Sequence, residues 1–145
     1  MTNHRRTRFE RELVQILSEQ LGEGWFGQRG AHSEGVDVLM FRKLDEMFFM
    51  GLRVEVKSKN NPFPLYLSER ERLQFQNYQE LENATGVKTY YAIRKVGHGK
   101  KWWFARMSDF TETKNGHPCL KHESVMEMEH FTTLVQANST AYVKD

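Results

Sequence analysis

The chain is organised around residues 35–59, which read GVDVLMFRKLDEMFFMGLRVEVKSK. Two runs within this stretch, residues 38–41 and 47–56, are rich in branched and aromatic side chains and have the length of strands. The residues between them, 42–46, form a short polar connection. The stretch therefore predicts an antiparallel β-hairpin.

The second strand of this hairpin carries charges in an otherwise apolar run. Successive side chains of a strand point to opposite faces, so Glu55 and Lys57 share one face, while the valines beside Glu55 point into the other layer. If the neighbouring strand brings Asp37 to the same end of the hairpin, two carboxylates and one ammonium converge. Such a set suits metal-dependent hydrolysis of a phosphodiester, because oxygen ligands hold Mg²⁺ and a cation stabilises the charge that develops on phosphorus. A solvated strand face with a cross-strand ion pair explains the same residues equally well.

Length and composition bound the class of protein. The chain has 145 residues, of which 39% are hydrophobic and 28% are charged, as is ordinary for a single soluble globular domain. No run approaches the roughly 18 apolar residues of a membrane span, and the basic start lacks the apolar core of a signal peptide. The single cysteine, Cys119, excludes an internal disulfide and favours a reducing compartment. We therefore expect a cytoplasmic protein that does not associate with membranes.

The basic residues are unevenly distributed, although the net charge of +2 is too small to indicate nucleic-acid binding by itself. Three arginines precede any acidic residue, and five basic residues fall within residues 94–106 with no acid among them. These are Arg5, Arg6 and Arg8, followed by Arg94, Lys95, Lys100, Lys101 and Arg106. Such clusters suit contact with phosphates, but a solvated and solubilising edge has the same composition.

A helix is predicted before the hairpin, because residues 9–21 have apolar side chains three and four positions apart and a glycine pair follows. At about 100° per residue, Glu10 falls inside the apolar stripe, whereas Glu12 falls on the polar side. A buried carboxylate is costly unless it meets a cation or a metal, so Glu10 requires a partner such as Lys57 or a shared ion. The alternative is that Glu10 flanks the start of the helix and gains from its dipole.

The connection between this helix and the hairpin contains both apolar and polar side chains. Trp25 and Phe26 have the character of core residues. Arg29 and Ser33 then precede Asp37, and a guanidinium and a hydroxyl leading into an acid suit the binding of a phosphate near a metal. An ordinary polar connection accounts for them equally well.

The second half of the chain alternates between strands and a helix. It predicts a short strand at 65–67, a helix opened by a capping box of Ser68 and Glu71 and ended by Gly86, and strands at 89–93 and 102–105. A strand, helix, strand unit normally forms a right-handed parallel crossover, so we expect an α/β fold with a mixed central β-sheet flanked by helices. An extra helix or an edge element is expected after residue 110.

In order and spacing, these residues resemble the archaeal-type Holliday junction resolvases of the PD-(D/E)xK nuclease superfamily. The resemblance runs from about residue 6 to residue 110 and rests on seven features. They are FERELVQIL at 9–17, Arg29 with Ser33, GVDVL at 35–39, VEVKSK at 54–59, YLSERE at 66–71, TYYAIRK at 89–95 and WWFARMSDF at 102–110. The resemblance implies a restriction-endonuclease-like nuclease domain over residues 1–110. A C-terminal extension over residues 111–145 would pack on this domain or trail from it.

The resemblance also implies a set of site residues. Asp37 and Glu55 would be metal ligands, and Glu10 would be a helix-borne acid that assists them. Lys57 would orient or activate the attacking water. The ion would be Mg²⁺, for which Mn²⁺ can substitute, held with the help of the Val56 carbonyl. Branched DNA would be recognised by its shape and phosphates through Arg5, Arg6, Arg8, Arg29, Ser33, Lys59, Lys100 and Lys101.

We therefore expect a Mg²⁺-dependent endodeoxyribonuclease that resolves four-way (Holliday) junctions by symmetric phosphodiester hydrolysis. A four-way junction presents two equivalent strands, so symmetric cleavage is expected of a homodimer. The aromatic residues 102–104 are a candidate dimer face, with core packing as the alternative. Two other functions stay open: a nuclease of the same superfamily that acts on flaps, duplex or a specific site, and a non-catalytic DNA-binding module. The presence of all four site residues argues against the module.

Overall fold

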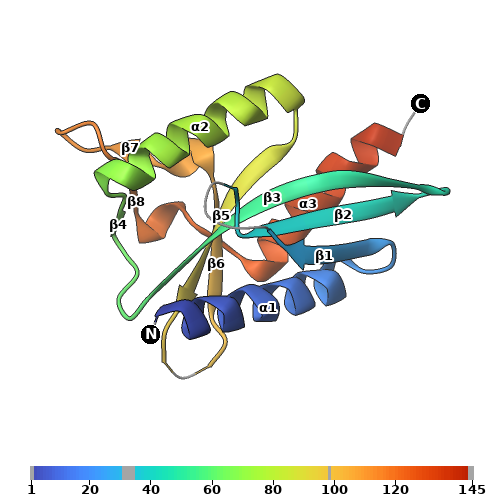
Figure 1. Ribbon diagram of the computed structural model, residues 1–145, viewed down its shortest axis with the longest axis horizontal. Coiled ribbons are helices and arrows are strands. Elements are labelled where there is room, and N and C mark those ends of the chain that lie inside the picture. The colour runs from blue at the N-terminus through green and yellow to red at the C-terminus, as the bar shows by residue number, and fades with distance from the viewer. Residues whose placement is uncertain (1, 31–34, 98, 144–145) are drawn as a thin grey trace.

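The computed structural model describes residues 2–30, 35–97 and 99–143, with side chains described for 7–30, 35–97 and 99–138. The chain order is α1 (Thr2–Leu21), β1 (Trp25–Arg29), β2 (Val38–Leu44), β3 (Met47–Lys59), β4 (Leu65–Tyr66), α2 (Glu69–Thr85), β5 (Lys88–Lys95), β6 (Trp102–Arg106), η1 (Met107–Asp109), β7 (Thr111–Glu112), β8 (Pro118–Leu120), η2 (His122–Ser124), β9 (Met126–Glu127) and α3 (Met128–Val143). The predicted hairpin is β2–β3, with a turn of two residues (Figure 1).

The central sheet is mixed, as the sequence predicts. Its six strands have the order β1-β2-β3-β5-β6-β9, and a smaller sheet has the order β4-β8-β7. β1, β2 and β3 are antiparallel neighbours, β3 and β5 are parallel, and β5, β6 and β9 are again antiparallel. The parallel pair is the one expected from the strand, helix, strand unit, because α2 connects β3 to β5 across one face of the sheet (Figure 1).

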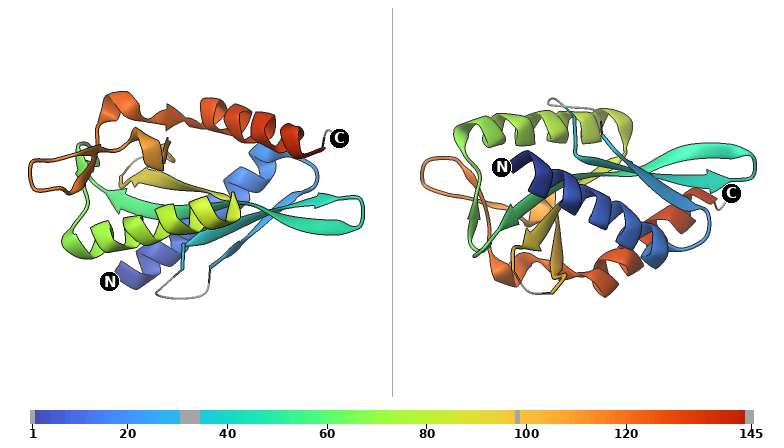
Figure 2. Two further views of the ribbon diagram at one scale, coloured as in Figure 1. Left: turned by 90° about the horizontal axis from the view of Figure 1, so that it is seen from above. Right: turned by 60° about the horizontal axis from the view of Figure 1, so that its bottom comes forward.

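Helices cover both faces of the sheet (Figure 2). A hydrophobic core lies under each layer of helices. Leu13 of α1 and Phe131 of α3 pack with Val54 of β3 in the first core. Phe75 of α2 packs with Ile93 of β5 in the second core. Because side chains alternate along β3, its apolar residues face α1 and α3, and its charged residues face the layer that contains α2. One face of β3 therefore packs in the first core, and its other face carries Glu55 and Lys57.

Helix α2 begins and ends as its sequence predicts. The Ser68 hydroxyl accepts a hydrogen bond from the Glu71 backbone N–H, and the Glu71 carboxylate accepts one from the Ser68 N–H, which completes the capping box. Gly86 closes the helix with a φ of 76°, a left-handed conformation that favours glycine. These caps fix where α2 starts over β3, and hence which of its side chains reach that strand.

Aromatic residues of β6 do not form a dimer face. Trp102, Trp103 and Phe104 are all buried within the two cores of a single chain. The dimer-face prediction for residues 102–104 is therefore wrong, and the alternative, core packing, is confirmed.

The start of the chain differs from the sequence prediction in two ways. α1 begins at Thr2 rather than at residue 9. The connection after it contains strand β1, in which Trp25 is buried but Phe26 is 39% exposed, so the prediction of Phe26 as a core residue is wrong. The cause is strand alternation, which turns one of two adjacent apolar side chains away from the core.

The residues after position 110 contribute to the same body as those before it. β9 pairs with β6 in the central sheet, and Phe131 and Val135 of α3 belong to the first core. The division into a nuclease domain at 1–110 and an extension at 111–145 stays a prediction. None of the helices in the described residues is long and apolar enough to span a membrane.

The prediction that Glu12 falls on the polar side of α1 is also wrong. Its carboxylate accepts hydrogen bonds from Arg94 Nε at 2.6 Å, from Arg94 Nη2 at 3.0 Å and from Trp102 Nε1 at 2.6 Å. Arg94 is 5% exposed, so it is a structural partner of α1 rather than part of a basic surface. Burial opposes ionisation of Glu12, but the hydrogen bonds from Arg94 and Trp102 prevail and lower its pKa.

Replacing Glu12 by alanine is expected to lower the free energy of unfolding by about 3 kcal/mol, because it leaves the Arg94 guanidinium buried without its charge partner. Since the fold lowers the pKa of Glu12, the stabilisation is present above the ordinary carboxylate pKa and is lost as the pH falls through the lowered value. Urea denaturation at neutral and acidic pH measures both effects. Glu19→Ala, at an exposed position on the same helix, is the control and should change stability by less than about 0.5 kcal/mol. Equal effects of the two variants would contradict the assignment.

Candidate active site

Three buried carboxylates lie around the start of β2 and the middle of β3. Glu10, Asp37 and Glu55 are 5%, 7% and 2% exposed. Asp37 directly precedes β2, and its Oδ2 accepts a hydrogen bond from the Val56 backbone N–H at 2.8 Å. The hairpin therefore brings Asp37 beside Glu55, the adjacency that the sequence predicts.

The backbone position of Asp37 is fixed by the end of β1. The Gly30 N–H donates to the Asp37 carbonyl at 2.7 Å. A Cβ atom at Gly30 would lie 2.0 Å from the Val36 carbonyl oxygen, so only glycine permits this approach. The end of β1 thus fixes the backbone position of Asp37, the first candidate metal ligand.

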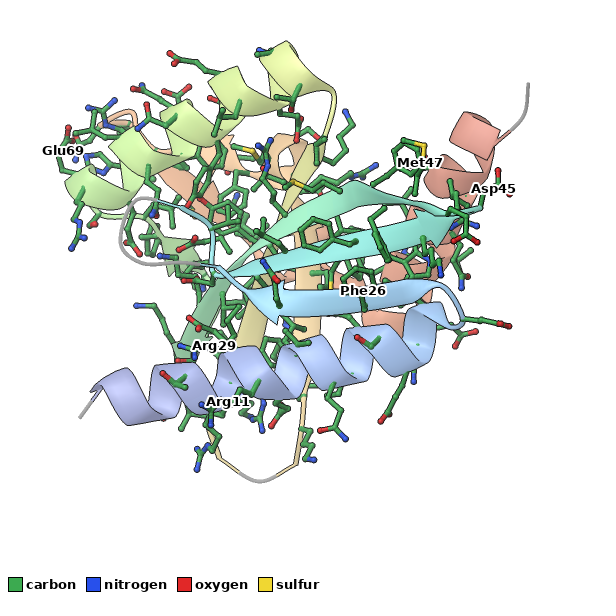
Figure 3. All side chains as sticks on the ribbon, turned by 45° about the vertical axis from the view of Figure 1, so that its right-hand side comes forward. Arg11, Phe26, Arg29, Asp45, Met47 and Glu69 are labelled. Atoms are coloured by element: carbon green, nitrogen blue, oxygen red, sulfur yellow. The ribbon has the colours of Figure 1, made fainter. Side chains whose placement is uncertain are left out.

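The partner of Glu10 is Arg29. Arg29 Nε donates to Glu10 Oε1 at 2.9 Å, and Arg29 Nη2 donates to the Thr7 hydroxyl at 3.3 Å, so Arg29 lies between β1 and α1 (Figure 3). Burial raises the pKa of Glu10, and the nearby Asp37 raises it further, against the lowering effect of Arg29. Lys57, the predicted cation partner of Glu10, instead pairs with other acids. The dipole alternative is also wrong, because α1 begins at Thr2 and holds Glu10 in its interior.

Glu55 is held by a residue that sequence reasoning missed. Tyr78 of α2 donates its hydroxyl proton to Glu55 Oε1 at 2.7 Å. Tyr78 is 2% exposed, and burial followed by the charge of Glu55 raises the pKa of its phenol, so it stays a donor. The sequence shows Tyr78 only as one of the apolar positions of a helix, which does not indicate that its hydroxyl reaches Glu55.

Lys57 lies between two acids. Its Nζ is 3.5 Å from Glu55 Oε2 and 2.5 Å from Glu71 Oε2. Glu71 therefore has two roles, because its other oxygen caps α2. Burial opposes ionisation of Glu71, but the bonds from Lys57 and Ser68 prevail and lower its pKa. The capping box predicts from the sequence that Glu71 lies in the first turn of α2, but it does not predict the contact of Glu71 with Lys57.

The donor chemistry of this region fits a divalent ion. Oxygens of Glu10, Asp37 and Glu55 are the hard ligands that Mg²⁺ and Mn²⁺ prefer. Nearby, the Tyr91 hydroxyl is buried with no hydrogen-bond partner among the described residues, which suits the water shell of an ion. No three acids, histidines or cysteines of the described residues stand close enough to enclose an ion in the present arrangement. The carboxylates of Glu10 and Asp37, which bond to Arg29 and Val56, would have to turn to bind it.

Five of the predicted DNA contacts have described side chains: Arg8, Arg29, Lys59, Lys100 and Lys101. Ser33 lies outside the described residues, and Arg5 and Arg6 lie on α1 where side chains are not described. Arg8, Lys59 and Lys100 are exposed, Arg29 has 39% of its side chain exposed, and Lys101 is exposed but pairs with Glu127. The structure therefore leaves Arg8, Lys59, Lys100 and part of Arg29 accessible to a phosphate.

Comparison with known proteins identifies the family. The family described as archaeal Holliday junction resolvase (Hjc) matches residues 1–140. The chain belongs to this family. Holliday junction resolvases of the Hjc family are metal-dependent endonucleases, so the family, the enzyme class and a divalent-metal dependence inferred from the sequence are confirmed. The match also includes most of the residues after position 110, which the sequence resemblance did not cover.

Solved structures share the fold. Hjc from Archaeoglobus fulgidus, a Holliday junction resolvase of an archaeal hyperthermophile, superposes with a TM-score of 0.64 at 22% identity, covering 88% of this chain and 94% of that one. D212, a nuclease from a fusselovirus, superposes with a TM-score of 0.53 at 4% identity, covering 74% and 70% of the two chains. No curated protein sequence matches the chain. The predicted fold class, a mixed sheet flanked by helices as in nucleases, is confirmed.

Tyr78→Phe is expected to reduce metal-dependent cleavage roughly 10-fold or more, because Glu55 loses the hydrogen bond that orients its carboxylate. The ring stays in place, so the melting temperature should change little. The measurement is the single-turnover cleavage rate as a function of Mg²⁺ concentration, which should shift to higher concentration in the variant. Tyr66→Phe, at a 58% exposed tyrosine, is the matched control. An unchanged rate and metal requirement in Tyr78→Phe would show that this bond does not position Glu55.

Proposed function

We propose that this protein resolves four-way DNA junctions by symmetric, Mg²⁺-dependent phosphodiester hydrolysis. The observation that carries the proposal is the burial of Glu10, Asp37 and Glu55 in one region, with Lys57 at 3.5 Å from Glu55, in a chain of the Hjc family. Burial makes these acids costly to keep charged, and a bound cation would offset that cost. In this proposal the cluster is a metal site, and the exposed cations around it contact DNA.

Asp37 and Glu55 would hold the ion, with Glu10 and the Val56 carbonyl completing the site. When bound, Mg²⁺ supplies a Lewis acid for the scissile phosphate and lowers the pKa of the attacking water, and Mn²⁺ can substitute for it. Tyr78 keeps Glu55 oriented, and Arg29 neutralises Glu10 until DNA arrives. Each acid is thereby kept in place by a partner from a different element.

Lys57 would position the attacking water and stabilise the negative charge that forms on the phosphate. Its side chain is only 15% exposed, and its contacts with Glu55 and Glu71 hold the ammonium at the edge of the carboxylate cluster. Glu71 thus restricts where Lys57 can point, which is the positioning that a fixed charge requires.

Recognition would depend on the shape and the phosphates of branched DNA rather than on its bases. The expected contacts are Arg5, Arg6, Arg8, Arg29, Ser33, Lys59, Lys100 and Lys101. Two equivalent cuts across a junction require two active sites related by a twofold axis, so we propose a homodimer, acting in the cytoplasm.

A four-way junction with labelled strands, compared with a linear duplex of the same sequence, tests the substrate. Wild type with Mg²⁺ is expected to make paired symmetric nicks in the junction and to leave the duplex intact. Asp37→Asn should lower the cleavage rate by at least about 100-fold, because it removes a metal ligand. Glu80→Gln, at an exposed position of α2, is the control. Cleavage of flaps or duplex instead would assign another nuclease activity, and tight binding with no cleavage would assign a DNA-binding module.

Glu10→Gln separates catalysis from stability. Because the fold raises the pKa of Glu10, its ionised form is disfavoured there, and a neutral amide of the same shape should fold with an equal or higher melting temperature at neutral pH. Metal-dependent cleavage should nevertheless fall by at least about 10-fold, while junction binding in EDTA is retained. Thermal melting and cleavage of the same preparation measure both. Unchanged cleavage would remove Glu10 from the site.

A further inference from the structure

The tip of the β2–β3 hairpin carries a group of exposed apolar side chains. Met47 is 62% exposed, Phe48 59%, Phe49 47% and Met50 38%, and Phe26 of the adjacent β1 is 39% exposed. We call these five residues the hairpin tip. The ribbon extends beyond the ends of α1 and α2, and Figure 3 shows Met47 next to Asp45 at its turn (Figures 1 and 3). An exposed apolar group of this kind normally marks a binding surface.

Aromatic residues lie on both faces of this ribbon. On one face, the Phe26 ring stacks on Phe41 at 5.5 Å and meets Phe48 edge-on at 5.2 Å. Phe49 lies on the opposite face, because it neighbours Phe48 in the strand, and its partner across the ribbon is Arg42. A flat contact with a single surface would cover only one of these faces. Insertion between two surfaces would cover both.

Each face also has a cation at the base of the tip. Lys43 Nζ lies 5.7 Å from the centre of the Phe48 ring, and the Arg42 guanidinium lies 5.8 Å from the Trp25 ring. Asp45 and Glu46 are confined to the turn, at the outermost point. Acids at this point disfavour burial of the tip in a lipid layer or in the apolar core of a partner, and in a complex with DNA they would have to stay in solvent, away from the phosphates.

The tip lies on the same ribbon as the proposed catalytic acids. Because side chains alternate along β2, Leu39, Phe41 and Lys43 point to one face, and Leu39 packs against the second core, which contains Tyr78, the partner of Glu55. The Phe26, Phe41 and Phe48 rings therefore share the face of Glu55. From Asp37 to Lys43 the strand spans roughly 20 Å at about 3.3 Å per residue. This length corresponds to about six base pairs of duplex at 3.4 Å each. DNA whose scissile phosphate lies at Asp37 would therefore reach the tip within one helical turn.

We propose that the hairpin tip is a wedge that inserts at the branch point of the DNA and stacks on the base pairs that the branch exposes. Phenylalanine and methionine are the side chains that proteins insert between base steps, and stacking on aromatic rings tolerates any base sequence. Arg42 and Lys43 would meet the phosphates of the two flanking strands. The inference rests on the proposed function and adds a second, non-catalytic contact that distinguishes branched from linear DNA.

The double variant Phe48→Ala with Phe49→Ala tests the wedge, with Leu81→Ala, at a 46% exposed apolar residue of α2, as the control. The probe is a four-way junction with 2-aminopurine next to the branch point, bound in Ca²⁺ so that it is not cleaved. Wild type and control should change the 2-aminopurine fluorescence on binding, and the double variant should not. Its affinity for the junction should fall about tenfold or more, and its affinity for linear duplex should stay the same. Phe48→Trp, which keeps a stacking ring, should behave as wild type.

Three results would overturn the wedge. The first is a double variant that binds and perturbs the junction as wild type does. The second is a double variant that sediments as a monomer where wild type is a dimer, which would make a second copy of the chain the occupant of the tip. The third is equal affinity of wild type for junction and duplex, which would also remove the proposed function. The first result leaves the proposed function intact, so the two failures are distinguishable.

Discussion

The burial of Glu10, Asp37 and Glu55 in one region is the constraint on which the rest of the structure depends. Buried carboxylates are stable only where each finds a donor or a cation, and here the donors come from different elements. Arg29 of β1 donates a hydrogen bond to Glu10, the backbone of β3 donates one to Asp37, and Tyr78 of α2 donates one to Glu55. Removing any one of these elements would take away one of these hydrogen bonds, so the fold of the sheet and the geometry of the site are coupled.

β3 connects these roles along a single strand. Its apolar side chains fill the core under α1 and α3, while Glu55 and Lys57 face α2. At its other end, beyond a register shift opposite Gly51, the strand leaves the helices and carries the hairpin tip. Gly51 is required there, because a Cβ atom would lie 2.5 Å from the Trp25 ring. The β2–β3 ribbon thus carries the proposed catalytic residues on one side of this register shift and the proposed contact with the DNA branch point on the other.

The local structure of this chain can be predicted from the sequence, whereas the contacts between elements that are distant in sequence cannot. The hairpin, the capping box of α2 and the place of Asp37 beside Glu55 depend on strand alternation and on neighbouring residues. Helical periodicity predicts that Glu10 is buried, but it does not predict that Arg29 is its partner. The periodicity indicates which face of the helix is covered, and it carries no information about which side chain of β1 contacts that face. The prediction that Glu12 lies on a polar face was wrong for a related reason. A helical projection assumes that only one face of the helix is covered, whereas Arg94 and Trp102, which are distant in sequence, cover a second part of α1. The contact of Tyr78 with Glu55 could not be predicted, because an apolar position of a helix indicates only that the side chain is buried.

Binding of Mn²⁺ to the DNA-free protein, followed by electron paramagnetic resonance, tests the central claim that these acids form a divalent-metal site. We expect saturable binding of one or two ions by wild type and loss of that binding in Glu55→Gln, with the protein still folded by circular dichroism. Equal Mn²⁺ binding by wild type and Glu55→Gln would contradict it and would make the buried acids a structural network.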